Sequence, residues 1–294
     1  MNLPDYPFVG KPFNIDGVKM NYLDEGVGDP VVMVHGNPSW SYYYRHLVLA
    51  LRGTHRCIVP DHIGCGYSDK PGDDRYDYTL ERRVDNLEAL LDHCGVEGRI
   101  TLVVHDWGGM IGLAFAMRKP ERIKRLVVLN TSAFLLPDTK PFPWPLWIVR
   151  NTLAGTLMVR GFNAFSRIAA TVCCTRNPMP KPVRDAYCSP YNSWDNRIAT
   201  LRFVQDIPLR PGDRSYAIVK HVQENVQQLT GVPMLVCWGL RDFVFDKHFL
   251  ALWEKHFPNA EFHRFDDCGH YILEDARDEV IPLIEKFLDA HPLT

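Results

Sequence analysis

The segment His105-Asp106-Trp107-Gly108-Gly109 places a carboxylate where chemistry is expected. It follows the apolar run 100–104 and leads into small glycines. An apolar strand that turns sharply into a helix over small residues is typical of a nucleophile elbow, which lifts one side chain above the edge of a sheet. The usual G-x-S-x-G pattern is changed here, because Asp106 replaces the serine and Val104 the leading glycine. A carboxylate nucleophile attacks carbon directly and forms a covalent intermediate.

Two candidates to assist Asp106 lie much later in the chain. His270 follows the last expected strand and Gly269, and it could act as the base that activates water. Asp242 follows the preceding strand and could orient that imidazole and stabilise its charged form. The order nucleophile, acid, base is one that catalytic triads use. The carboxylates near Asp242 that compete with it for the acid role are Asp246, Asp266 and Asp267.

Uncharged donors next to the nucleophile point to an anion of low basicity. The backbone N–H groups of Trp107 and Asn37 could stabilise a developing oxyanion. Their indole and amide side chains add donors without charge, so the pair could hold a halide or a similar leaving anion. Each residue also has a plain structural interpretation, since Asn37 precedes Pro38 in a possible turn and Trp107 could be a packing aromatic. The nearby His35 and His105 are interpreted as loop-holding residues.

Short apolar strands alternating with amphipathic helices position these side chains. This alternation predicts parallel strands joined by helical crossovers. Thr79 is expected to cap one such helix and Gly95 to end it. After Asn130 the pattern gives way to a stretch rich in proline and aromatic residues. We therefore predict a first core segment at 1–131, an inserted helical cap at 132–213 and a second core segment at 214–294. The expected strands are 31–34, 57–60, 100–105, 125–130, 234–238 and 261–265, and a last helix covers 280–288.

Composition excludes several classes of function. The chain has 294 residues, 46% of them hydrophobic, and a formal net charge of −2, which gives no reason to expect nucleic acid as a partner. Neither a signal peptide nor a membrane-spanning run is expected. The eight cysteines are scattered without a C-x-x-C pair, so reduced thiols in the cytoplasm are favoured over disulfides or zinc. No metal or other cofactor is implied.

Several segments resemble the haloalkane dehalogenase family of α/β-hydrolases. They are 35–40, 60–71, 105–109 and 268–271, and the resemblance spans nearly the whole chain. It implies an α/β fold in which helices flank a mostly parallel eight-stranded sheet and a helical cap is inserted. It also implies that Asp106 is the nucleophile, His270 the base, and Asn37 with Trp107 the halide-binding pair. Some members of the family carry a glutamate where this chain has Asn130, so the resemblance places the acid at Asp242 instead.

A closer resemblance concerns the substrate. Segments 191–198, 205–209 and 238–247 are similar to the β-lactone decarboxylases of bacterial long-chain olefin biosynthesis. Such enzymes convert a disubstituted cis-β-lactone to a cis-alkene and CO2, and the resemblance extends to a homo-oligomer or an assembly with pathway enzymes. A hydrophobic cis-β-lactone is therefore the first hypothesis. Which ring carbon Asp106 attacks stays open, so the intermediate is an ester or an anhydride.

Three other hypotheses compete with lactone decarboxylation. A haloalkane dehalogenase would release halide and hydrolyse an ester on Asp106. An epoxide hydrolase would need two cap tyrosines, for which Tyr187 and Tyr191 are candidates, but Asn37 replaces the aromatic residue usual in that family. A catalytically silent binding protein on the same fold would have no need of Asp106, Asp242 and His270 together.

Overall fold

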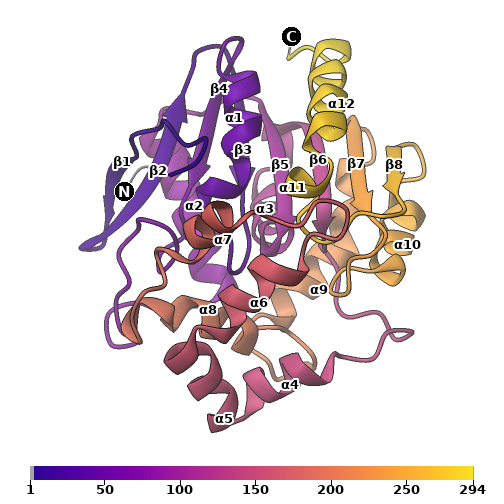
Figure 1. Cartoon of the computed structure of the whole chain (residues 1–294). Helices are drawn as coiled ribbons and strands as arrows, with labels where there is room; N and C mark the ends of the chain where they lie inside the picture. The colour runs from indigo at the N-terminus through magenta and orange to yellow at the C-terminus, as the bar shows by residue number, and fades with distance from the viewer. Residues whose placement is uncertain (1–2, 294) are drawn as a thin grey trace.

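A twisted eight-stranded sheet forms the centre of the protein, as the computed structural model shows for residues 3–293 (Figure 1). The strand order is β1-β2-β4-β3-β5-β6-β7-β8, and only β2 runs against the others. This confirms the predicted mostly parallel sheet. The strands are β1 (Lys11–Ile15), β2 (Val18–Glu25), β3 (Asp29–Val34), β4 (His55–Pro60), β5 (Ile100–Asp106), β6 (Ile123–Thr131), β7 (Met234–Gly239) and β8 (Glu261–Phe265).

Each predicted strand is present and agrees to within a few residues at its ends. The first two strands were not placed from the sequence, because they lie at one side of the sheet and carry polar as well as apolar residues. Predicted helix ends are also confirmed. The Thr79 side chain accepts a hydrogen bond from the N–H of Arg82 at the start of α2 (Leu80–His93), and Gly95 after that helix has a φ of 64°.

Alternating side chains of the central strands fill two apolar layers. On β5, Leu102 and Val104 face one layer and Val103 faces the other, as the two-residue period of a strand requires. The first layer packs against α2, α3 (Trp107–Arg118), α9 (Tyr216–Asn225) and α10 (Lys247–His256). The second packs against α1 (Arg45–Leu51), α11 (Ile272–Asp275) and α12 (Arg277–Ala290). All seven residues of β5 are buried, so the sheet fixes the end of this strand firmly.

Most of the short helices between β6 and α9 lie beyond the lower end of the sheet in Figure 1, whereas α7 (Lys181–Cys188) lies higher and packs in the second apolar layer. They have a small apolar cluster of their own, which includes Val149, Val159 and Leu201. The division of the chain at residues 132 and 213 stays a prediction. These elements are α4 (Trp144–Asn151), α5 (Leu153–Thr156), η3 (Leu157–Gly161), α6 (Ala164–Val172), α7 (Lys181–Cys188), η4 (Asp195–Arg197) and α8 (Ile198–Gln205).

The turn from β5 to α3 is sharp and tightly packed. Asp106 has a φ of 53° and a ψ of −125°, a strained conformation that is uncommon for any residue other than glycine and fits a nucleophile elbow. A Cβ atom at Gly108 would overlap the carbonyl oxygen of Val34, so only glycine allows α3 to start this close to β3. The elbow predicted from the sequence is therefore present, with its glycine needed for close approach.

Candidate active site

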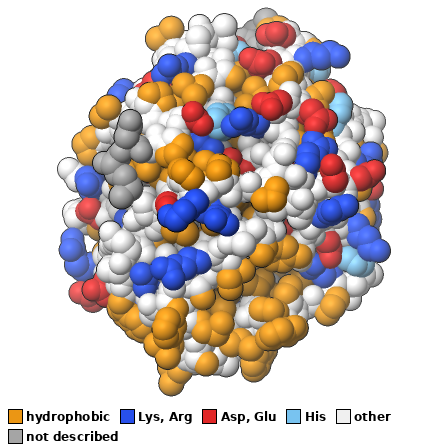
Figure 2. Space-filling view, in the orientation of Figure 1, with side chains coloured by type: hydrophobic (Ala, Val, Ile, Leu, Met, Phe, Trp, Pro, Cys, Tyr) orange, Lys and Arg blue, Asp and Glu red, His pale blue; other side chains and the backbone are white. Residues whose placement is uncertain are grey.

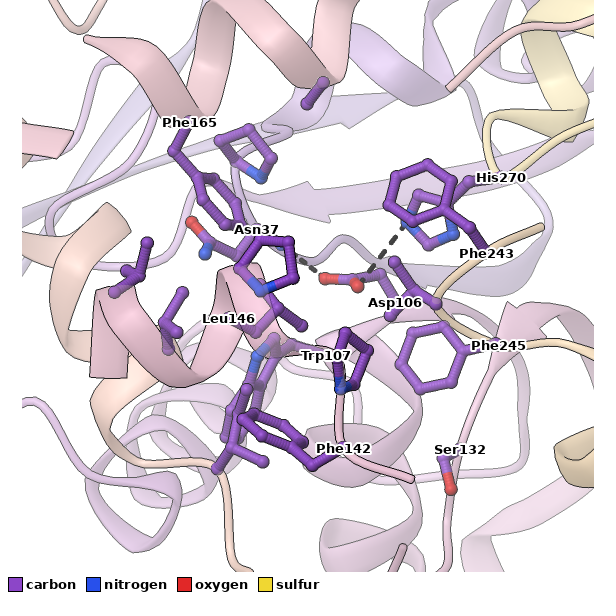
Figure 3. Close-up of a pocket in the computed structure, with 18 of the residues that line it drawn as sticks. Asn37, Asp106, Trp107, Ser132, Phe142, Leu146, Phe165, Phe243, Phe245 and His270 are labelled. Atoms are coloured by element: carbon purple, nitrogen blue, oxygen red, sulfur yellow. Dashed lines mark hydrogen bonds and ion pairs between the residues drawn. The ribbon is translucent and has the colours of Figure 1, made fainter. Parts of the chain in front are cut away.

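The Asp106 side chain lies at the end of β5, between two groups that bind its carboxylate (Figure 3). The backbone N–H of Asn37 donates a hydrogen bond to Oδ1 of Asp106, with an N–O distance of 2.6 Å. Nε2 of His270 lies 3.5 Å from Oδ2. The side chain is buried yet faces a cavity. One carboxylate oxygen is therefore held by the Asn37 loop and the other by the imidazole, which together fix the orientation of the Asp106 side chain.

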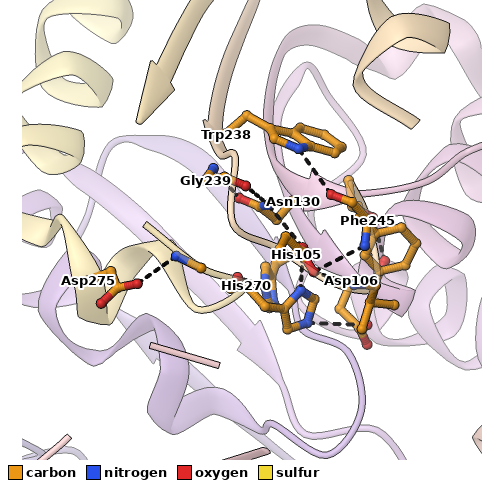
Figure 4. Close-up of polar contacts among 12 residues, drawn as sticks. His105, Asp106, Asn130, Trp238, Gly239, Phe245, His270 and Asp275 are labelled. Carbon is orange, nitrogen blue, oxygen red and sulfur yellow. Dashed lines mark hydrogen bonds and ion pairs between the residues drawn. The ribbon is translucent and has the colours of Figure 1, made fainter. Parts of the chain in front are cut away.

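His270 bridges two carboxylates. Its Nδ1 lies 2.7 Å from Oδ2 of Asp242 (Figure 4), while its Nε2 faces Asp106. Burial lowers the pKa of His270, but the charges and hydrogen bonds of Asp242 and Asp106 outweigh burial and raise this pKa to about 10. A pKa of this size favours the imidazolium at neutral pH, which donates from Nδ1 to Asp242 and forms an ion pair with Asp106.

Asp242 is the carboxylate that orients His270. Its Oδ1 accepts hydrogen bonds from the N–H groups of Val244 and Phe245, at 2.7 and 3.1 Å. Two of its three competitors are engaged elsewhere, since Asp246 pairs with Lys140 and caps α10, and Asp267 pairs with Arg176. The structure thus brings together the three residues Asp106, Asp242 and His270 that the sequence singled out.

Asn130 supports Asp242 in a way that the sequence did not reveal. Its side-chain amide nitrogen donates to Oδ2 of Asp242 and to the carbonyl oxygen of Gly239, and both distances are 3.0 Å. Its side-chain oxygen accepts from the N–H of Gly239 over 2.8 Å (Figure 4). The sequence showed only that Asn130 cannot serve as the acid. Its pairing with Gly239, more than 100 residues away, depends on β6 and β7 lying side by side.

Asn37 and Trp107 present donors to the same cavity. The Asn37 amide nitrogen uses one hydrogen on the carbonyl of Thr200, at 3.1 Å, which leaves a second one. The Trp107 indole N–H has no acceptor among the residues that the structure describes. Figure 3 shows both residues to the left of Asp106 and His270 to its right. An anion released opposite the attacking carboxylate would therefore meet these two donors.

The cavity above Asp106 has a volume of about 450 Å³ and is mostly apolar. Volumes of this order suit small organic ligands. The sequence indicated an aromatic-rich cap but not the loop after β7, where Phe245 stacks on His270 with ring centres 5.8 Å apart. Besides the catalytic candidates, the lining includes Phe134, Phe142, Trp144, Leu146, Val149, Met158, Phe165, Ile168, Cys173, Phe243, Val244 and Phe245.

Other candidates from the sequence lie outside this arrangement. Tyr187 donates to Glu274, and Tyr191 lies near the carbonyl of Ser39. Both side chains are buried away from the cavity, so neither can activate an epoxide there, and that assignment is wrong. His105 binds the carbonyl of His270 over 2.9 Å, which agrees with its interpretation as a loop-holding residue. Burial lowers its pKa well below the usual value, so it stays neutral.

Comparison with known proteins identifies the family. A family profile described as "alpha/beta hydrolase fold" matches residues 29–276. The chain belongs to the alpha/beta hydrolase fold family. It is 64% identical over 96% of its length to the "Cis-3-alkyl-4-alkyloxetan-2-one decarboxylase" of Shewanella oneidensis, of which 89% is covered. Identity to the enzyme of that name from Xanthomonas campestris pv. campestris is 49%, with both chains covered completely.

Haloalkane dehalogenases are more distant relatives of this hydrolase-fold protein. The crystal structure of the haloalkane dehalogenase DatA from Agrobacterium tumefaciens superimposes with a TM-score of 0.86 over 97% of both chains, at 22% sequence identity. Identity this low supports the shared fold. Both levels of the resemblance noted in the sequence, to haloalkane dehalogenases and more closely to the β-lactone decarboxylases, are thereby confirmed.

The charged state of His270 makes the stability of this hydrolase-fold protein depend on pH. The folded pKa of about 10 exceeds the usual 6.5, so the contribution to the free energy of unfolding is complete below about pH 6.5 and is lost as the pH rises towards 10. A shift of this size corresponds to at most about 5 kcal/mol. We expect urea titrations to show the wild type losing stability across this range relative to His270→Gln. Tyrosine and cysteine titration affects both proteins alike, so parallel curves would contradict the expected ion pair.

Proposed function

We propose that the protein is a cis-3-alkyl-4-alkyloxetan-2-one decarboxylase, which converts a β-lactone with two alkyl substituents to a cis-alkene and CO2. The observation that carries this choice is the 64% identity to a relative of that name over nearly the whole chain. The arrangement of Asp106, His270 and Asp242 under an apolar cavity supports it, since a hydrophobic electrophile needs both. Asp106 is the proposed nucleophile.

The donors around Asp106 favour attack on the ring carbon C4. Attack on the carbonyl carbon would expel an alkoxide, which is strongly basic and needs a proton. Attack of Asp106 on C4 instead breaks the C4–O bond and sends its electron pair to a carboxylate, an anion of low basicity. Uncharged donors such as the indole of Trp107 and the amide of Asn37 suit such an anion. The first intermediate is then an alkyl ester of Asp106.

Loss of CO2 from that ester restores the enzyme without water. The bond from C3 to the carboxylate breaks, and its electron pair forms the C3–C4 double bond. The C4–O bond to Asp106 breaks at the same time and returns its pair to the Asp106 carboxylate. The His270 imidazolium, held by Asp242, stabilises the Asp106 carboxylate as it is released from C4. No proton is gained or lost in the sum of these steps.

The stereochemistry agrees with this route. Attack of Asp106 from the side opposite the ring oxygen inverts C4. The two bonds that break in the next step are then antiperiplanar across C3–C4. The alkyl groups of a cis-lactone stay on the same face during this change. Anti elimination therefore gives the cis-alkene directly, without rotation about C3–C4.

Haloalkane dehalogenation is a second candidate, favoured by the Asn37 and Trp107 donor pair. In that reaction Asp106 displaces a halide, and the ester is hydrolysed by water. Formation of the ester removes the charge of Asp106, which lowers the pKa of His270 and allows it to accept a proton. The same residues then act as nucleophile, base and halide-binding pair.

A direct comparison of the two substrates tests the proposal. We expect one preparation of the enzyme to release alkene from a cis-β-lactone, detected by gas chromatography. Under the same conditions we expect at most about a hundredth of that rate of bromide release from a short dibromoalkane. Absence of alkene together with rapid bromide release would replace lactone decarboxylation by dehalogenation.

The cellular setting is also a proposal. We place the enzyme in the cytoplasm, which is supported by eight cysteines that all stay as thiols in the described structure. Within residues 3–293 no helix has both the length and the apolar character to cross a membrane. Assembly with itself or with enzymes of olefin biosynthesis stays a prediction.

A further inference from the structure

An apolar surface covers the end of the molecule farthest from α12 (Figure 2). Its exposed side chains come from α4, α5, η3, α6 and the residue after η3, and these elements pack against one another. Leu153 is 88% exposed and Phe162 is 65% exposed, which is unusual for large apolar side chains that lie in one region. We call this surface the apolar tip, defined by Trp144, Trp147, Leu153, Leu157, Phe162 and Ile168.

The cavity above Asp106 opens onto the apolar tip. Trp144 and Ile168 belong to both, because each is more than half exposed and each also lines the cavity. An apolar molecule that leaves the cavity past these two apolar side chains reaches the tip directly. The tip thus lies on the path between the nucleophile and the surroundings.

Basic side chains lie along one border of the tip, although six of those in residues 132–213 form ion pairs with carboxylates. Residues 132–213 contain ten Lys and Arg against five Asp and no Glu, although the whole chain has a formal net charge of −2. Arg167 stands next to Ile168 and makes no ion pair with the residues that the structure describes. The guanidinium of Arg197 donates only to backbone carbonyls, including that of Tyr191. Figure 2 shows Lys and Arg side chains along the upper border of the apolar face.

We propose that the apolar tip docks on an anionic lipid surface, with the mouth of the cavity facing the lipid. Apolar and aromatic side chains that protrude beside basic residues insert at the level of the headgroups, while the guanidinium groups pair with anionic phosphates. The positive segment complements such a surface, which a neutral apolar partner would not require. Resting on the proposed function, this docking lets a lactone with long alkyl chains pass from lipid to Asp106 without entering water.

Vesicle binding tests the docking separately from the chemistry. We expect the wild type to co-sediment with vesicles of equal parts phosphatidylglycerol and phosphatidylethanolamine, and to bind phosphatidylcholine vesicles or vesicles in high salt more weakly. The variant Leu153→Asp/Phe162→Asp replaces two exposed side chains that do not line the cavity. It should bind the anionic vesicles at least about tenfold more weakly, because it loses apolar contact and adds repulsion.

A matched control carries the same substitutions elsewhere. Val9 and Val27 are 82% and 78% exposed and lie before β1 and between β2 and β3, so Val9→Asp/Val27→Asp should bind vesicles like the wild type. Both double variants should act on a short water-soluble lactone at the wild-type rate. Only the tip variant should be slow on a long-chain lactone supplied in vesicles.

Three outcomes would overturn the docking proposal. In the first, the wild type stays in the supernatant with anionic vesicles. In the second, the tip variant binds these vesicles as well as the control variant does. In the third, the wild type binds no vesicles but forms a dimer without lipid, and the tip variant abolishes that dimer. The last would assign the tip to a second copy of the chain. Vesicle binding without any lactone turnover would instead leave the docking intact and reject the proposed function.

Discussion

Asp106→Asn is expected to lower the turnover of a cis-β-lactone by at least about a thousandfold. An amide oxygen cannot form the ester that starts the reaction, while it can still accept the hydrogen bond from the N–H of Asn37. Asparagine also has nearly the same shape as aspartate, so it disturbs the packing of the elbow less than a truncation to alanine would. Alkene formation measured by gas chromatography under saturating lactone gives the effect on kcat.

The control for this variant is its fold. Circular dichroism and thermal unfolding should show a native protein, because the substitution changes neither the volume nor the backbone of the elbow. Fresh preparations are needed, since slow deamidation of the introduced asparagine would restore the carboxylate and some activity. Turnover within tenfold of the wild type in such a preparation would rule out Asp106 as the nucleophile.

Enzyme that has converted many equivalents of lactone in H2¹⁸O is expected to carry no ¹⁸O in Asp106. Under the proposed elimination, the C–O bond to C4 breaks and both carboxylate oxygens stay with the enzyme. Hydrolysis would instead send labelled water to the carbonyl carbon of the ester or anhydride, and label would build up in the side chain. Mass spectrometry of the peptide that contains Asp106 distinguishes these routes completely.

A dibromoalkane provides the positive control for the isotope experiment. Any alcohol that it yields must come from hydrolysis of an ester on Asp106, so the same peptide should become heavier by one labelled oxygen. Label in Asp106 after lactone turnover would show that water enters the cycle. His270 would then act as a base, as in dehalogenation, and attack on the carbonyl carbon would again be open.

The central strands and the elbow could be predicted because their signals are local. Apolar runs such as 100–104 and glycines such as Gly108 specify a strand and a close turn within a few residues. The triad could be predicted because each candidate lies at the end of an expected strand or in the loop after it, in the chain order nucleophile, acid, base. The structure places the imidazole of His270 between the carboxylates of Asp106 and Asp242.

Residues whose importance depends on distant neighbours were beyond the sequence. Phe245 reads as an ordinary loop residue until its ring is seen against His270. Tyr187 and Tyr191 were candidates for epoxide activation because they lie in the cap, but side-chain direction decides their role, and both point into the core. The opening of the cavity onto exposed apolar side chains likewise requires the packing of four short elements.

The hydrogen bond from Asn130 to Asp242 limits how this site could evolve. A lineage that placed its acid on β6 would face the same imidazole from position 130. Holding acids at both positions would set two carboxylates about as close as the 3.0 Å that now separates the Asn130 amide from Asp242, so one would need to be neutral. Asn130→Asp alone creates that repulsion, and Asp242→Asn alone leaves His270 without its partner. The two positions are therefore epistatic, and each ancestor could exchange its acid only through a weakened intermediate.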